Sequence, residues 1–147
     1  MTKKKVMVID DDPIVGEMIE EVLQESGLQV TRVNDGFAGF IEIPKIRPDC
    51  ILLDIMMPRF DGFEMLKKLK DKIPGFHTPV IIISARRDES SVTKAIELGV
   101  IDYLLKPVSV SSILTKVGKA LNIPLTEEQK KSSEGYLTKK VENIVVI

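Results

Sequence analysis

The stretch that decides the fold reads KVMVIDDDP and spans residues 5–13. Residues 5–9 form a short, mostly apolar run bounded by charge, which is typical of a buried strand. Three aspartates follow at once: Asp10, Asp11 and Asp12. Adjacent carboxylates repel one another, so a buried strand that ends on them indicates a site that uses this repulsion. Asp12 precedes Pro13, and we interpret it as a helix cap rather than a metal ligand.

The composition indicates a soluble globular protein. The chain has 147 residues, of which 44% are hydrophobic and 29% charged, and this length suits one domain with a short appendage. A net charge of −1 gives no bulk attraction to nucleic acid or to an anionic membrane. No apolar run reaches the roughly 20 residues of a membrane span. The single cysteine, Cys50, excludes an internal disulfide and a cysteine-based zinc site. We expect a cytoplasmic protein.

Strands and helices alternate along the chain. Short apolar runs predict strands at residues 5–9, 28–33, 50–53, 79–83 and 103–105. Apolar residues at three- and four-residue spacing predict helices at residues 13–26, 37–43, 63–73, 89–98 and 110–121. This alternation predicts an α/β fold with a parallel sheet and helices on both faces.

Details of three helices follow from the same patterns. In the first, Ile14 belongs to the apolar stripe that should face the core. In the fourth, the stripe consists of Val92, Ala95 and Ile96. The second is expected to end early or distort at Pro44, because proline cannot donate a helical hydrogen bond.

The predicted domain covers residues 1–121. Residues 122–147 hold four lysines and four glutamates, so their net charge is zero. We interpret this segment as a helix extension, tail or linker, because terminal segments are often loosely held. Apolar residues return at 136–147, and a docking or dimerising segment is the alternative.

Polar side chains stand where four of the five strands end: Asp10 and Asp11, Asp54, Ser84, and Lys106. In a doubly wound sheet, ligands bind beyond the carboxyl ends of the strands, where the strand order reverses. In a five-stranded, flavodoxin-like sheet of order 2-1-3-4-5, the first and third strands are neighbours at that point. Three carboxylates would then converge beside one hydroxyl and one ammonium group.

Such a cluster favours a divalent cation. Three carboxylates in one cleft cannot all stay ionised without compensation. Mg²⁺ takes oxygen ligands, commonly one or two carboxylates together with a phosphate. Lys106 offers a second positive charge, Ser84 offers a hydroxyl donor, and Asp54 is the candidate nucleophile for an acyl phosphate.

The chain resembles the receiver domain of two-component response regulators, the fold of the chemotaxis signal protein. The resemblance covers residues 4–121 and rests on the motifs VMVIDDDP, ILLDIMMPRFDGFEML, VIIISA and GVIDYLLKPV. It implies that Asp54 is the phosphoacceptor and that Mg²⁺ is the cofactor. Asp11 would ligate the ion directly, Asp10 largely through water, and Met56 through its backbone carbonyl.

The resemblance also implies a conformational switch. Lys106 would pair with the phosphoryl group, and its bond to Pro107 would be cis. Ser84 holds the switch position, and Tyr103 is the aromatic residue that moves between exposed and inward states. The surface of the fourth helix, fifth strand and fifth helix would change shape with phosphorylation.

The implied protein is a signalling switch rather than an enzyme with an external substrate. A sensor histidine kinase or histidine phosphotransferase would donate the phosphoryl group, and the domain would later hydrolyse its own acyl phosphate. The switched surface would control a downstream protein or output domain, and it could form a homodimer. The last helix, SVSSILTKVGKAL, lacks the arginines common in receivers that drive DNA-binding domains, so no direct binding of nucleic acid is expected.

Two other classes share parts of this pattern. Magnesium-dependent phosphohydrolases with an aspartate nucleophile usually carry a second acid two residues later, where this chain has Met56. A flavin-binding domain of the same topology would need a phosphate-binding loop after the first strand, and three aspartates there would repel the phosphate.

Overall fold

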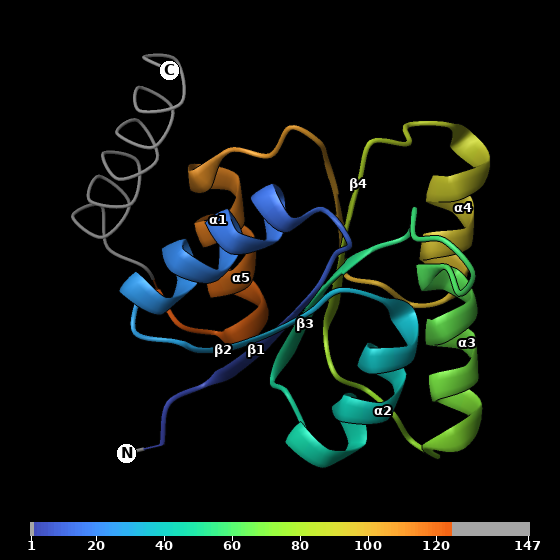
Figure 1. The fold of residues 1–147 in the computed structure, drawn as a ribbon, viewed down its shortest axis with the longest axis horizontal. Helices are drawn as coiled ribbons and strands as arrows, with labels where there is room; N and C mark the ends of the chain where they lie inside the picture. The colour runs from blue at the N-terminus through green and yellow to red at the C-terminus, as the bar shows by residue number, and fades with distance from the viewer. Residues whose placement is uncertain (1, 125–147) are drawn as a thin grey trace.

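The computed structural model describes residues 2–124, and the predicted tail beyond residue 124 lies outside this range. Figure 1 shows a central sheet covered by helices on both faces. The strands are β1 (Lys5–Ile9), β2 (Gln29–Val33), β3 (Cys50–Asp54), β4 (Val80–Ser84) and β5 (Asp102–Leu105). The helices are α1 (Pro13–Glu25), α2 (Gly36–Ile46), α3 (Gly62–Lys72), α4 (Glu89–Glu97) and α5 (Val110–Leu121).

The sheet has the predicted topology. Its five strands lie in the order β2-β1-β3-β4-β5, and every neighbouring pair is parallel. The register aligns the carboxyl ends of the inner strands, because Ile9 pairs with Leu53 and Asp54 pairs with Ile83. The residues that follow these ends therefore meet at one edge, between β1 and β3, where the chain order reverses.

Two hydrophobic cores hold the sheet, one on each face. Val6 and Val8 of β1 pack toward α1 and α5, whereas Met7 and Ile9 pack in the core beneath α2 and α3. In Figure 1, α1 and α5 cover one face while α2, α3 and α4 cover the other. Strands β3 and β4 are buried along their whole length, as expected for parallel strands covered on both sides. No helix within residues 2–124 is long and apolar enough to cross a membrane.

Every helix begins with a polar cap at the edge of the sheet where the strands end. The capping side chains accept hydrogen bonds from backbone N–H groups in the first turn, and they belong to Asp12, Asp35, Asp61, Asp88 and Ser109. Asp12 accepts from the N–H groups of Ile14 and Val15, which confirms its prediction as a cap. These caps fix the loops that surround the carboxyl edge of the sheet.

Of the two outcomes expected at Pro44, an early end of the second helix or a distortion, the early end is wrong. Helix α2 runs through Pro44 to Ile46 and ends at Arg47, which has a φ of 54°. Proline removes one N–H donor and crowds the carbonyl of Phe40, but tertiary contacts outweigh this cost. Ile43 is buried in the core, and Ile46 packs against the same cluster.

Two isoleucines predicted to face the core are exposed instead. Ile14 in α1 is 73% exposed, and Ile96 in α4 is 69% exposed. In α1 the side that faces the core is formed by Gly16, Ile19 and Val22, and Ile14 lies on a neighbouring side of the helix. In α4 the buried residues are Ala95 and Ser91, whose N–H donates to the capping Asp88, so this short helix packs through small side chains.

Replacing Pro44 with alanine should stabilise the protein. The substitution gives α2 back an N–H donor for the carbonyl of Phe40, and the gain should exceed the added freedom of the unfolded chain. We expect the free energy of unfolding in urea to rise by about 1 kcal/mol. Pro48→Ala, which lies after the helix, is the control and should give no such gain. A Pro44→Ala variant no more stable than the parent would contradict this account of α2.

Candidate functional site

The predicted site residues meet at the carboxyl edge of the sheet. Asp54 is the last residue of β3, and Ser84 is the last residue of β4. Asp10 and Asp11 follow β1, and Lys106 follows β5. One carboxylate oxygen from each of Asp10, Asp11 and Asp54 lies within 4.8 Å of the other two. Asp12 is outside this group and caps the N-terminus of α1.

Lys106 links two of the three carboxylates. Its Nζ lies 3.0 Å from Oδ2 of Asp10 and 3.1 Å from Oδ2 of Asp54. The backbone N–H of Lys106 donates to the carbonyl of Ser84, which fixes where the lysine leaves the sheet. The bond from Lys106 to Pro107 is cis. Burial favours the neutral amine, but the two carboxylates outweigh it and raise the pKa of Lys106 above its ordinary value.

Asp54 is a buried carboxyl group with an altered acidity. Its pKa is raised from 3.8 to about 6, chiefly by burial and in part by the nearby charge of Asp10. The N–H of Met56 donates to Oδ1 at 2.9 Å and, together with Lys106, lowers the pKa in part. Above pH 6 the group is therefore ionised at a cost in free energy, which makes it a good partner for added positive charge.

Both carboxylate oxygens of Asp10 have a partner. Its Oδ1 accepts from the N–H of Asp12 at 2.8 Å. Its Oδ2 is buried and lies 3.0 Å from the ammonium of Lys106, with which it forms an ion pair. A single ammonium group therefore faces three clustered carboxylates. This excess of carboxylates fits a hard cation like Mg²⁺, which takes oxygen ligands.

Ser84 and Tyr103 both contact the backbone of Arg86. The Oγ of the fully buried Ser84 accepts from the N–H of Arg86 at 3.1 Å. The hydroxyl of Tyr103 donates to the carbonyl of Arg86 at 2.7 Å. One residue of the β4–α4 loop therefore joins the two side chains that the resemblance assigns to the switch. The sequence contained no signal for this link, because it uses only backbone atoms of Arg86.

Met56 lies at the entrance of the site. Its N–H binds Asp54, and its side chain is half exposed beside a cleft of about 370 Å³. Arg86 and Lys94 line the same cleft, which opens between the β3–α3 loop and α4.

Cys50 takes no part in the site. It begins β3, at the opposite end of the strand from Asp54, and burial raises the pKa of its thiol to about 12. The thiol therefore stays protonated and unreactive near neutral pH.

Comparison with known proteins identifies the family. The family model described as "Response regulator receiver domain" matches residues 6–118. The response regulator MprA of Mycobacterium leprae is 32% identical over 113 residues, which are 77% of this chain and 49% of that protein. The DNA-binding response regulator MtrA of Mycolicibacterium smegmatis is 29% identical over 78% of this chain and 49% of its own length. The chain thus spans about half the length of these curated relatives.

Solved structures with the same fold are also receivers. The chemotaxis protein CheY4 of Vibrio cholerae superposes with a TM-score of 0.76 at 25% identity, over 82% of this chain and all of that one. The receiver domain of the Francisella response regulator 1452 gives a TM-score of 0.75 at 32% identity, over 82% of this chain and 98% of that domain.

The chain belongs to the receiver domain family of two-component response regulators. Its function is that of a phosphate-accepting signalling domain, and the phosphohydrolase alternative is not favoured. Response regulators as a class work with histidine kinases and with output domains.

Replacing Asp54 with asparagine should stabilise the metal-free protein above pH 6. The pKa of Asp54 is raised from 3.8 to about 6, so the folded state holds this proton more tightly than the unfolded state does. The free energy of unfolding of the parent should therefore fall as the pH rises from about 4 through about 6. In the variant, the contribution of residue 54 to this decrease should be absent. In EDTA at pH 7.5 we expect the variant to melt roughly 3–5 °C higher, as about 1 kcal/mol would cause.

The same comparison at pH 4 provides the control. There Asp54 is mostly protonated in the folded protein, so the two proteins should melt at nearly the same temperature. A difference in melting temperature that is equal at pH 4 and pH 7.5 would show that ionisation of Asp54 has no part in it.

Proposed function

We propose that Asp54 is the phosphoacceptor. The supporting observation is that this buried carboxylate belongs to the cluster of three aspartates and lies 3.1 Å from the ammonium of Lys106. A carboxylate oxygen of Asp54 attacks the phosphorus of a phosphohistidine. The new O–P bond forms as the P–N bond breaks, and the imidazole leaves with its electron pair and takes a proton from solvent. The product is an acyl phosphate on Asp54.

The acid cluster would hold Mg²⁺. Asp10, Asp11 and Asp54 supply the carboxylates, and the backbone carbonyl of Met56 supplies a further oxygen. When bound, Mg²⁺ neutralises charge on the transferred phosphoryl group. The three carboxylates and Lys106 carry a formal charge of −3 + 1 = −2 when ionised, which leaves room for a divalent ion.

Lys106 is proposed as the second positive group in phosphoryl transfer. It already contacts Oδ2 of Asp54, so its ammonium lies where an oxygen of the transferred group would arrive. The N–H of Met56 holds Oδ1 of the same carboxylate and fixes its orientation. Positioning together with charge compensation is most of what phosphoryl transfer requires.

Ser84, Arg86 and Tyr103 are proposed to transmit phosphorylation to the surface. A phosphoryl group on Asp54 brings acceptor oxygens close to the Oγ of Ser84, which can then donate to them. Ser84 would give up its bond from the N–H of Arg86, and the β4–α4 loop would move. The carbonyl of Arg86 holds the hydroxyl of Tyr103, so that side chain would respond to the same movement. A local charge change would thus bias a two-state element.

The output surface proposed here is formed by α4, β5 and α5. Three of its apolar side chains are exposed, namely those of Ile96, Ile101 and Leu105. Exposed apolar side chains near a switch support binding of a downstream protein, an output domain or a second copy. We propose that this chain acts through such protein contacts and binds no nucleic acid itself. A sensor kinase or histidine phosphotransferase would be the donor.

We further propose that the only chemistry of this domain is its own phosphorylation and dephosphorylation. No turnover of external phosphate esters is expected, because Met56 stands where phosphohydrolases with an aspartate nucleophile usually carry a second acid. The division at residue 121 and the cytoplasmic location stay predictions from the sequence.

Beryllofluoride with Mg²⁺ should bind the protein as a phosphoryl mimic. We expect saturable changes in the ¹H–¹⁵N spectrum, with the largest shifts at Ser84, Arg86 and Tyr103. Asp54→Ala should abolish them, because the carboxylate that holds beryllium is gone. Absence of a response in the parent, or an unchanged response in Asp54→Ala, would refute the proposed acceptor. Multiple turnover of small phosphomonoesters by the parent would instead support the phosphohydrolase alternative.

Ser84→Ala separates phosphorylation from its transmission. This variant keeps Asp54, Lys106 and the acid cluster, so it should still bind beryllofluoride with affinity within about a factor of ten of the parent. It lacks the hydroxyl that links the acceptor to Arg86. We therefore expect the shifts near Asp54 to persist and those at Tyr103 to shrink strongly. Full shifts at Tyr103 in this variant would contradict a route through Ser84.

A further inference from the structure

The loop that follows Asp54 is closed on itself by backbone contacts. The N–H of Gly62 donates to the carbonyl of Ile55 at 3.3 Å, and the N–H of Phe60 donates to the carbonyl of Pro58 at 2.8 Å. Arg59 sits in the left-handed region with a φ of 69°, which is unfavourable for a residue with a side chain. Such a conformation persists only where its surroundings hold it in place. The loop is therefore shaped by what packs against it.

Two glycines allow that packing: Gly62, which follows the loop at the start of α3, and Gly36, which lies in α2. A Cβ atom on Gly62 would lie 2.8 Å from the carbonyl oxygen of Asp54 and 2.9 Å from the Cα of Ile55. A Cβ atom on Gly36 would lie 2.5 Å from the carbonyl oxygen of Phe60. Each contact is with backbone, which cannot turn aside as a side chain can. Gly36 belongs to the first turn of α2, on a different element from the acceptor loop.

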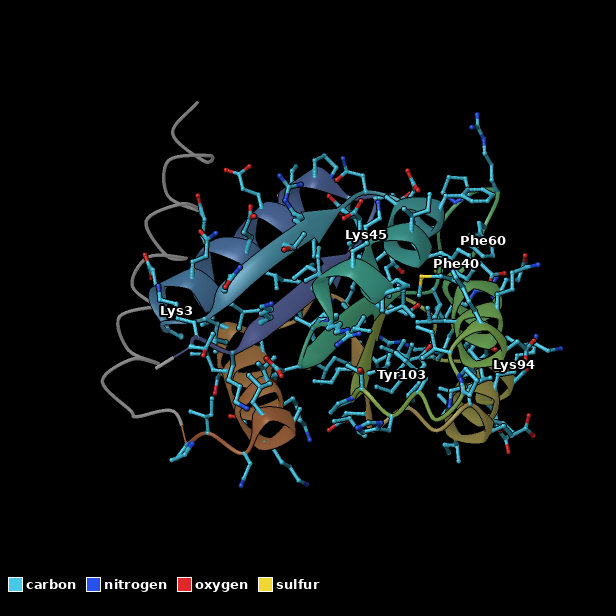
Figure 2. The ribbon with its side chains drawn as sticks, turned by 90° about the horizontal axis from the view of Figure 1, so that it is seen from below. Lys3, Phe40, Lys45, Phe60, Lys94 and Tyr103 are labelled. Carbon is cyan, nitrogen blue, oxygen red and sulfur yellow. The ribbon has the colours of Figure 1, made fainter. Side chains whose placement is uncertain are left out.

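The side chain of Phe60 fastens the loop to the same helix. Its ring is buried, with its centroid 4.7 Å from that of Phe37 and 6.2 Å from that of Phe40. Figure 2 shows Phe40 and Phe60 close together between α2 and α3. The ring anchors the loop by packing, and the bare backbone of Gly36 sets how closely the loop approaches α2. Met56, whose N–H holds Asp54, lies four residues before Phe60 in this loop.

From these contacts we infer that Gly36 is a positioning residue for the phosphorylation site. It touches neither the acid cluster nor the acceptor, and it acts through Phe60 on the loop that carries Met56. A methyl group at position 36 would push the carbonyl of Phe60 outward and shift the loop against Asp54. The inference rests on the proposed function, because it concerns the metal and phosphoryl site assigned above.

Gly36→Ala and Gly39→Ala form a matched pair of variants. Both place alanine in α2, where it is the better helix former, and neither glycine has a positive φ. At Gly39 a Cβ would meet the Cδ1 of Ile9 at 2.7 Å and the Sδ of Met65 at 3.1 Å. These atoms are the ends of core side chains, so Gly39→Ala disturbs packing without touching the loop.

The first measurement is the ¹H–¹⁵N spectrum of each full-length variant without metal. Gly36→Ala should shift the amide signals of Ile55, Met56 and Gly62, whereas Gly39→Ala should leave them in place. This comparison needs no metal, so it tests the inference even if the proposed function fails. Unmoved signals in Gly36→Ala, or equal shifts in both variants, would overturn the inference.

The second measurement is Mg²⁺ titration, with the melting temperature of each protein recorded alongside. We expect Gly36→Ala to weaken Mg²⁺ binding by roughly 10-fold, which is the low end for changes to residues outside the metal ligands. Gly39→Ala should keep an affinity for Mg²⁺ within about twofold of the parent's, even if its melting temperature falls as much as that of Gly36→Ala. Equal affinities for the two variants would overturn the inference. The absence of Mg²⁺ binding by the parent would refute the proposed function instead.

Phe60→Ala tests the same link if Gly36→Ala fails to fold. Removing the ring releases the loop from Phe37 and Phe40, so the amide signals of Met56 should move and Mg²⁺ binding should weaken as above. Phe60→Leu keeps an apolar anchor and should restore most of the affinity. Wild-type Mg²⁺ binding in Phe60→Ala would overturn the inference.

Discussion

The repulsion between the buried carboxylates of Asp10 and Asp54 is the interaction on which the rest of the structure depends. Both side chains are held at the ends of neighbouring strands, so neither can move away without breaking the pairing of the sheet. Lys106 bridges them and compensates part of the charge. The compensation is incomplete, because one ammonium group faces three carboxylates and the pKa of Asp54 stays above its ordinary value. The folded domain therefore holds a site that attracts further positive charge.

The fold holds the strands that carry the site rigidly, whereas the β4–α4 loop, which would transmit the signal, can adapt. Two closely packed cores fix β1, β3 and β4, and close-packed interiors respond to change by switching between arrangements rather than by yielding gradually. The β4–α4 loop is held near the site by the hydrogen bonds that Arg86 makes with Ser84 and Tyr103. A change of charge at Asp54 should therefore be taken up by this loop. Moving such an equilibrium from 1:99 to 99:1 requires about 5.5 kcal/mol of preference.

Most of this architecture could be predicted from the sequence because strand ends, caps and strand order each leave a local signal. The continuous apolar strands and the residues that end them predicted the sheet and the meeting of Asp10, Asp54, Ser84 and Lys106. Pro44 was misjudged because burial of Ile43 and Ile46 outweighs a local preference. Ile96 was misjudged because a nine-residue helix can rest on small side chains. The contacts of Gly36 and Arg86 use backbone atoms, which leave no trace in the side-chain pattern.

Stability and function are opposed at this edge of the sheet. A neutral residue at position 54 would relieve the repulsion, but it would also remove the proposed nucleophile and part of the charge that would recruit a cation. Sites of this kind persist because the rest of the domain supplies the stability that they lack. Here the two cores and five capped helices do so, and the glycines at positions 36 and 62 let backbone approach closely enough to hold the acceptor loop. Packing on both faces of the sheet thus holds together the mutually repelling carboxylates that would bind Mg²⁺ and accept a phosphoryl group.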